Sequence, residues 1–156
     1  RVMSFREKNA WIAVVTTLVI WTVYFWQVGN AALSGTLDGD AIFWLFVWCL
    51  SISIAIMLPV NIAAAILARQ NMDAPPDERE REIDARANRI GLILLEWLMV
   101  AVILSSGLIA GFAREVYAAD PAGATAIILI NLMLFALAFS ALTREIIQIV
   151  HFRMLD

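Results

Sequence analysis

The stretch that decides the fold runs from Ala41 to Ala68 and reads AIFWLFVWCLSISIAIMLPVNIAAAILA, 28 residues without a charge. An α-helix needs about 20 apolar residues to cross a hydrocarbon core of about 30 Å, so this segment is long enough to span a bilayer once. Three further stretches share this character: 9–37 and 121–143 carry no charge, and 90–113 carries only Glu96. Runs of this length differ from the roughly 10-residue alternating strands of a membrane barrel. The sequence therefore predicts an all-α integral membrane protein with four transmembrane helices.

The composition of the whole chain agrees with this fold class. Of the 156 residues, 62% are hydrophobic and 16% are charged, whereas soluble domains average about 45–50% and about 25%. With 7 Gly, 4 Pro and one Cys, the chain is not collagen-like, disordered or a disulfide scaffold. The lone cysteine, Cys49, lies inside the second apolar stretch, where we expect it to be a small packing residue.

The charge-free stretches predict one domain, residues 1–156, built as two hairpins. We expect the helices at about 11–28, 41–68, 78–112 and 124–150, the last two including cytoplasmic extensions, with a charged connector at 69–89. Two hairpins of equal orientation are typical of a tandem parallel repeat. The short openings 6–9 and 86–89 resemble each other faintly, and chance similarity between apolar helices is the other interpretation.

The distribution of Lys and Arg predicts the orientation. Ten of the 11 basic residues lie on the side of the termini and the connector, and Arg114 is the exception. By the positive-inside rule, we expect both termini and the connector of this multi-pass protein to lie in the cytoplasm. The first apolar stretch exceeds the 7–15 residues of a signal-peptide core, so we expect it to be retained. Met3 is an alternative natural start.

The connector holds 11 of the 25 charged residues. Pro75 and Pro76 end the second helix, and Asp77 with Glu80 resembles a capping box that starts the third near Glu78. Two interpretations are open: a solvated, salt-bridged helix extension, or a docking surface for a protein partner. The mixed signs favour protein over anionic lipid as the partner. The candidate docking residues are Glu78, Arg79, Arg81, Glu82, Arg86 and Arg89.

An ionisable residue inside a membrane helix is a candidate functional site. Glu96 lies seven residues beyond Arg89, about 10 Å along the helix. Counting inward from the cytoplasmic ends of the other helices reaches a layer of polar residues at a similar depth: Thr17, Asn61 and Ser140. A carboxyl group there would stay protonated through desolvation, with Asn61 and Ser140 as its hydrogen-bond partners. The layer is either a structural polar clamp between helices or a site for a proton, ion or ligand.

Other kinds of site are disfavoured. One His and one Cys are too few for a zinc cluster or for bis-His haem. The sequence contains no Ser/His/Asp set, P-loop or glycine-rich dinucleotide loop, and no basic face with interleaved aromatics. We therefore expect a non-enzymatic chain without a cofactor or direct nucleic-acid binding. Arg144, Gln148 and His151 share one helix face, which we interpret as an interfacial polar stripe.

Small and aromatic residues suggest how the helices pack. Gly107 and Gly111 form a GxxxG spacing, which lets helix backbones approach closely. We expect this pair to pack inside the bundle, with homodimerisation as the alternative. Aromatic residues near the outer ends of the first two helices are interpreted as an interfacial belt: Tyr24, Phe25, Trp26, Phe43 and Trp44.

Two cytoplasmic stretches carry a resemblance to a known family. They are MSFREKNAW at 3–11 and DEREREID at 77–84, the latter continuing through Arg86 to 89–91. Together they resemble a family of small uncharacterised four-helix bacterial inner-membrane proteins, often encoded beside a helix-turn-helix regulator of the XRE type. The resemblance implies no catalytic residues. It implies a membrane protein that senses envelope conditions or holds a regulator at the membrane.

The expected function follows from the layout and this resemblance together. We expect a sensor or anchor in the lipid bilayer whose cytoplasmic face binds a protein partner such as a transcriptional regulator. One alternative is binding or transport of a small solute or proton around Glu96. Another is an accessory subunit of a larger membrane complex.

Overall fold

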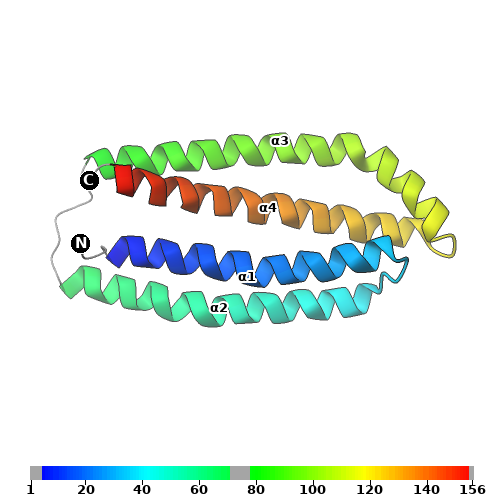
Figure 1. Cartoon of the computed structure of the whole chain (residues 1–156), viewed down its shortest axis with the longest axis horizontal. Helices are drawn as coiled ribbons and strands as arrows, with labels where there is room; N and C mark the ends of the chain where they lie inside the picture. The colour runs from blue at the N-terminus through cyan, green and yellow to red at the C-terminus, as the bar shows by residue number, and fades with distance from the viewer. Residues whose placement is uncertain (1–4, 71–77, 155–156) are drawn as a thin grey trace.

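The computed structural model describes residues 5–70 and 78–154. This part of the chain folds into four helices (Figure 1): α1 Phe5–Leu33, α2 Gly39–Gln70, α3 Glu78–Val116 and α4 Pro121–Met154. All four are long and apolar enough to cross a membrane, over Lys8–Leu33, Gly39–Ile66, Arg81–Val116 and Pro121–His151. The predicted all-α fold of four candidate membrane-spanning helices is therefore confirmed.

The helices extend beyond several of the expected ends. Helix α1 includes six residues before Trp11 and five after Val28, and α4 begins three residues before Ala124. Each added turn bonds backbone groups that would otherwise need another partner at a membrane boundary. Helix α3 begins at Glu78, while its expected cap, Asp77, lies outside the described residues. Helix α2 continues through Pro59.

A capped turn joins α1 to α2. Gly35 has a φ of 73°, a left-handed conformation that glycine adopts without a steric penalty. The Thr36 amide donates to the Ala31 carbonyl at 3.0 Å, which is the bonding pattern of a Schellman helix end. The Asp38 carboxylate then accepts from the Asp40 amide at 3.0 Å and caps the start of α2.

The α3–α4 turn is capped in a similar way and also contacts the first hairpin. The Asp120 carboxylate accepts from the Gly123 amide at 2.9 Å, and Pro121 occupies the first position of α4, where a missing amide proton is tolerated. Tyr117 in this turn donates its hydroxyl to the carbonyl of Ala32 at 2.6 Å. This bond links the two hairpins at the end of the bundle that holds both turns, hereafter the turn end.

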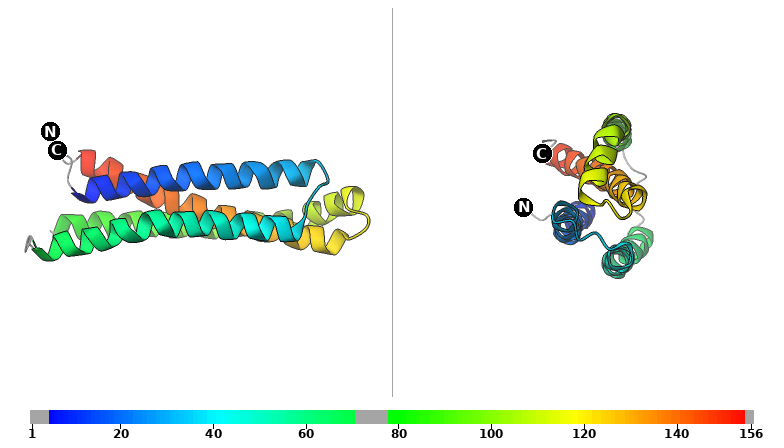
Figure 2. Two further views of the ribbon diagram at one scale, coloured as in Figure 1. Left: turned by 90° about the horizontal axis from the view of Figure 1, so that it is seen from below. Right: turned by 90° about the vertical axis from the view of Figure 1, so that its right-hand side faces the viewer.

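The bundle is an open row of helices. The closely packed pairs in the described residues are α3–α4, α1–α4 and α1–α2, so α1 and α4 are central and α2 and α3 flank them (Figure 2). Phe5 and Met154 lie at the same end as Gln70 and Glu78 (Figure 1). We call this the connector end. Both hairpins therefore run out from the connector end and return to it.

Small residues form the contact between α3 and α4. Ala87 and Ala113 on α3 are fully buried, as is Ala136 on α4. At Gly91, an added Cβ would lie 3.5 Å from the Ser140 carbonyl oxygen, so the two backbones approach closely there. An added Cβ at Gly107 or Gly111 would meet nothing within 4 Å. The expected packing of the GxxxG pair inside the bundle is therefore wrong, and the close approach lies nearer the connector end.

Candidate functional site: a polar cavity at the connector end

The structure does not form the expected buried site around Glu96. The Glu96 side chain is exposed on α3, next to exposed Trp97, and it makes no hydrogen bond or ion pair with the residues at 5–70 and 78–154. The reason is helical phase. Gly91 is buried on the α4-facing side of α3, and five residues at about 100° each turn Glu96 about 140° away from it. This corrects the expected burial of the carboxyl group.

The other three residues of that predicted layer are also separate from Glu96. Ser140 is buried, and its hydroxyl donates to the Ala136 carbonyl at 2.8 Å within α4. Thr17 is half-buried on α1. Asn61 is largely exposed on α2 but lines a cavity. Of the four, only Asn61 belongs to the polar centre that the structure does contain.

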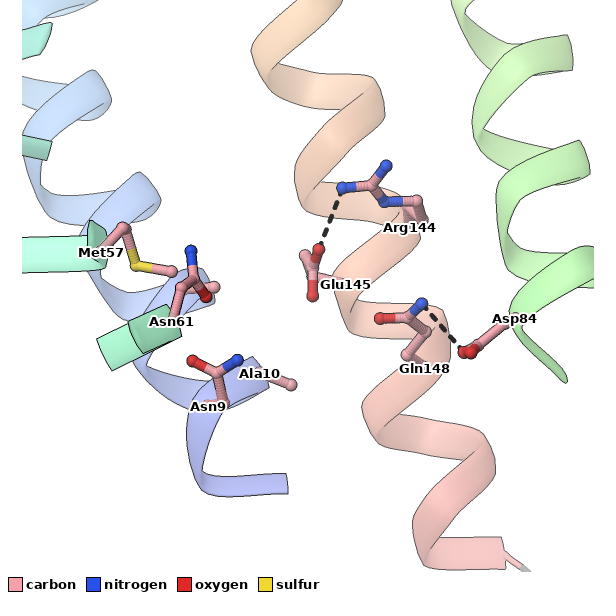
Figure 3. Close-up of a pocket in the computed structure, with 9 residues that line it drawn as sticks. Asn9, Ala10, Met57, Asn61, Asp84, Arg144, Glu145 and Gln148 are labelled. Carbon is pink, nitrogen blue, oxygen red and sulfur yellow. Dashed lines mark hydrogen bonds and ion pairs between the residues drawn. The ribbon is translucent and has the colours of Figure 1, made fainter. Parts of the chain in front are cut away.

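That polar centre is a cavity of about 420 Å³ between the two hairpins (Figure 3). All four helices contribute to its lining, which consists of Asn9, Ala10, Ala13, Met57, Asn61, Asp84, Arg144, Glu145 and Gln148. Asn9 adjoins Lys8, where the apolar span of α1 begins, and Gln148 is three residues from the end of the span of α4 at His151. The cavity therefore lies at the connector-end boundary of the spans.

Two hydrogen-bonded pairs organise the wall formed by α3 and α4. The Gln148 amide donates from Nε2 to Asp84 Oδ1 at 3.2 Å. Arg144 Nη2 donates to Glu145 Oε1 at 3.1 Å, and both side chains of this ion pair are partly exposed. Because such partly exposed pairs add little stability, their importance here is the chemistry that they present to the cavity.

Two buried polar atoms of the lining have no hydrogen-bond partner in the described residues. They are Asn9 Oδ1, an acceptor, and Arg144 Nε, a donor. A buried polar atom left unpaired costs about 1–3 kcal/mol. The lining therefore holds unused hydrogen-bonding capacity.

The lining carries one more negative than positive charge. Asp84 and Glu145 are opposed by Arg144 alone, and the remaining polar groups are the neutral amides of Asn9, Asn61 and Gln148. Ala10, Ala13 and Met57 supply the apolar part. Across residues 5–70 and 78–154, no group of three or more His, Cys, Asp or Glu residues is placed to hold a metal ion. The arrangement is suited to hydrogen-bonding a small polar or cationic group.

The expected docking residues surround a second, smaller feature. Arg79, Glu82 and Arg86 line a groove of about 280 Å³ together with Ile83 and His151. Ile83 is the buried apolar member of this lining, while Arg86 Nη2 lies 3.8 Å from Glu82 Oε1 in an exposed pair. Glu78, Arg81 and Arg89 are exposed on the same part of α3. We call this feature the connector-end groove.

The polar stripe of α4 divides between these two features. Arg144 and Gln148 line the cavity, and His151 lines the connector-end groove. The sequence pattern thus located a polar face correctly, but its interpretation as a simple interfacial stripe did not anticipate that two concave surfaces share it.

Sequence reasoning missed a buried polar contact between α1 and α4. Tyr24 is 1% exposed, and its hydroxyl donates to Asn131 Oδ1. Asn131 Nδ2 in turn donates to the Ile127 carbonyl at 2.9 Å. The assignment of Tyr24 to an interfacial belt is therefore wrong. A usable signal was present, because Asn131 is the one side-chain amide in the charge-free stretch 121–143.

In comparisons with known proteins, no family model, no curated protein and no solved structure matches this chain.

Proposed function

We propose that the chain is a non-enzymatic membrane protein that holds a protein partner at the membrane through the connector-end groove. The supporting observation is the groove itself, which is lined by charged side chains together with the buried apolar Ile83. Binding energy at protein interfaces concentrates where one anchoring side chain fills a desolvated pocket within a polar rim. A groove of about 280 Å³ has room for one such side chain.

The charge of the groove indicates the kind of partner. The charged side chains that line it are Arg79, Arg86 and Glu82, a net charge of +1. The side chains of Glu82 and Arg86 are 75% and 62% exposed, so solvent screens their pairing and leaves them accessible to another molecule. We infer a partner with an acidic surface next to a projecting apolar side chain. Complementary charge of this kind mainly sets specificity and association rate.

The location of the groove supports a cytoplasmic partner. Helix ends Phe5 and Met154 and both ends of the connector lie together at the connector end, and ten of the 11 basic residues belong to that side. The positive-inside rule then favours a cytoplasmic connector end. The resemblance to bacterial inner-membrane proteins supports an inner-membrane location and a transcriptional regulator as the partner.

The two alternative functions have less support. Solute or proton binding around Glu96 would need partners for that carboxyl group, and its side chain is exposed without a contact among the described residues. A role as an accessory subunit would use the exposed apolar side chains of α2 and α3, but lipid covers such side chains equally well.

Charge reversal in the groove tests the proposal. The double variant Arg79→Glu/Arg86→Glu inverts the rim, and Arg114→Glu, an exposed residue of α3 at the turn end, is the matched control. Proteins that co-purify from native membranes would be quantified by mass spectrometry. We expect a partner to be lost with the double variant, retained with the control and weakened by salt. An identical set of proteins with all three chains, or a change confined to bound anionic lipid, would overturn the proposal.

A further inference from the structure

We propose that the connector-end cavity binds a primary ammonium group, carried either by a small soluble amine or by an aminophospholipid headgroup. This inference does not depend on the proposed function, because the cavity and the connector-end groove share no lining residue. A volume of about 420 Å³ falls within the range of about 300–1,000 Å³ typical of small-molecule sites.

The positive charge of the proposed ligand is inferred from Asp84. Within the lining, Arg144 is paired with Glu145, whereas Asp84 accepts a hydrogen bond from the neutral amide of Gln148 and has no cation beside it in the described residues. Asp84 is half-buried, so it has lost part of its hydration, and a nearby cation would offset that loss. A monovalent cation in the cavity balances this charge and brings the net charge of the lining and its occupant to zero.

The type of cation follows from the hydrogen-bonding atoms. An –NH₃⁺ group has three donors and no acceptor, and the cavity offers acceptors on opposite walls. Asn9 and Asn61 lie on the wall formed by α1 and α2, and Asp84 and Glu145 come from α3 and α4 (Figure 3). Asn9 Oδ1 is buried and still unpartnered. With three donors, an ammonium group can bond one acceptor on each wall at the same time.

Other cations fit the lining less well. Quaternary ammonium groups have no N–H donor and are recognised by aromatic cages, but the described residues that line the cavity include no aromatic ring. Divalent metals require several carboxylate, His or Cys ligands, and the described chain places no three such residues together. Of these three classes of cation, the primary ammonium fits the lining best.

The position of the cavity explains why two sources of ammonium are open to it. The cavity lies at the boundary of the spans, where an amine arrives from water and a headgroup arrives from the bilayer. Ala10, Ala13 and Met57 provide an apolar wall for a short alkyl chain. The Arg144 side chain, which is 43% exposed, would be available to the phosphate of a headgroup.

The test uses the full chain in nanodiscs of phosphatidylcholine, titrated calorimetrically with ethylammonium chloride. Tetramethylammonium, which lacks N–H donors, is the control ligand. We expect saturable binding of ethylammonium with a Kd of about 1 mM or lower and no binding of tetramethylammonium.

Asp84→Asn should weaken ethylammonium binding about tenfold or more. Asn9→Leu, which removes the unpartnered acceptor, is a second variant with the same expected direction. Glu96→Gln removes an exposed carboxylate from the same helix and should leave binding unchanged.

A lipid arm distinguishes the two sources. Nanodiscs enriched in phosphatidylethanolamine should lower the apparent affinity for ethylammonium if the headgroup occupies the cavity, and leave it unchanged if only soluble amines enter. Either result upholds an ammonium site. The proposal is overturned if ethylammonium shows no saturable binding in phosphatidylcholine, if tetramethylammonium binds equally well, or if Glu96→Gln weakens binding as much as Asp84→Asn.

Discussion

The buried hydrogen bond between Tyr24 and Asn131 yields the sharpest stability prediction. Tyr24 and Asn131 are both buried, and their contact links the first hairpin to the second across 107 residues of sequence. Tyr24→Phe removes only the hydroxyl group. The ring keeps its edge-on neighbours Trp21 and Phe25, with centroids at 5.5 and 5.1 Å, so packing is preserved while Asn131 Oδ1 loses its donor.

The expected magnitude comes from the behaviour of hydrogen bonds between membrane helices. Double-mutant cycles place such bonds at about 0.6 kcal/mol on average and about 1.7 kcal/mol at most. We expect a coupling free energy near the upper value, because both side chains are buried and Asn131 is already oriented by its bond to Ile127. The single variants Tyr24→Phe and Asn131→Leu should each destabilise the bundle. The double variant should lose less than the sum.

The assay is equilibrium unfolding by SDS in mixed micelles for all four members of the cycle. Ser51→Ala is the matched control, because Ser51 donates to the Val47 carbonyl within one helix at 2.7 Å and is exposed. Its effect should stay below about 0.5 kcal/mol. If the two variants of the cycle are additive within about 0.3–0.5 kcal/mol, the contact does not couple the hairpins and the reasoning fails.

Two more predictions concern α3. Gly91→Val adds branched carbons where an added Cβ alone would lie 3.5 Å from the Ser140 carbonyl oxygen and from Arg144 Cβ, so it should destabilise the bundle by about 1–3 kcal/mol in SDS unfolding. Gly107→Val, in open space, should change stability by less than about 0.5 kcal/mol, and equal effects would contradict the close approach at Gly91. Glu96→Leu replaces an exposed carboxyl group within the apolar span and should make the apparent insertion free energy in a translocon assay more favourable by about 2–3 kcal/mol. An unchanged value would mean that Glu96 does not face lipid.

The number and approximate positions of the helices, but not all of their ends, were predictable from the charge-free stretches. A segment without charges that is long enough to span must be helical to satisfy its backbone, and residues 41–68 alone establish this. The start of α3 at Glu78 was likewise predictable from the two prolines and the acidic residues that follow them. Local chemistry fixes both features, so no knowledge of the neighbouring helices is required.

The faces of the helices were not predictable by the same means. Lipid-facing and bundle-facing positions are both apolar, so hydrophobicity alone does not mark the buried side. Small residues lie on the buried side of α3 at Ala87, Gly91 and Ala113, but the equally small Gly107 faces open space. Residue size alone therefore does not mark the buried side either, and it does not predict the exposed position of Glu96. Tyr24 was misassigned for the related reason that an aromatic ring suits both an interface and a core.

The cavity was harder to predict from the sequence, because its lining comes from all four helices. Asn9 and Gln148 are separated by nearly the whole chain, and nothing local to either residue indicates the other. Some of its members were visible as a pattern, since Arg144 and Gln148 share a helix face. The sequence does not reveal that the helices pack in the order α2–α1–α4–α3. This order places the polar face of α4 opposite Asn9 and Asn61.

The long sequence separation of Tyr24 and Asn131 has a consequence for biosynthesis. A ribosome adds about 5–20 residues per second, so the 107 residues between the two side chains take roughly 5–20 seconds to make. During that interval α1 is already synthesised while the amide that accepts its tyrosine hydroxyl does not yet exist. The first hairpin must meanwhile satisfy that hydroxyl through water, a lipid headgroup or the insertion machinery. The nascent protein thus passes through an intermediate in which the Tyr24 hydroxyl lacks its Asn131 partner, and the insertion of α4 completes the hydrogen bond.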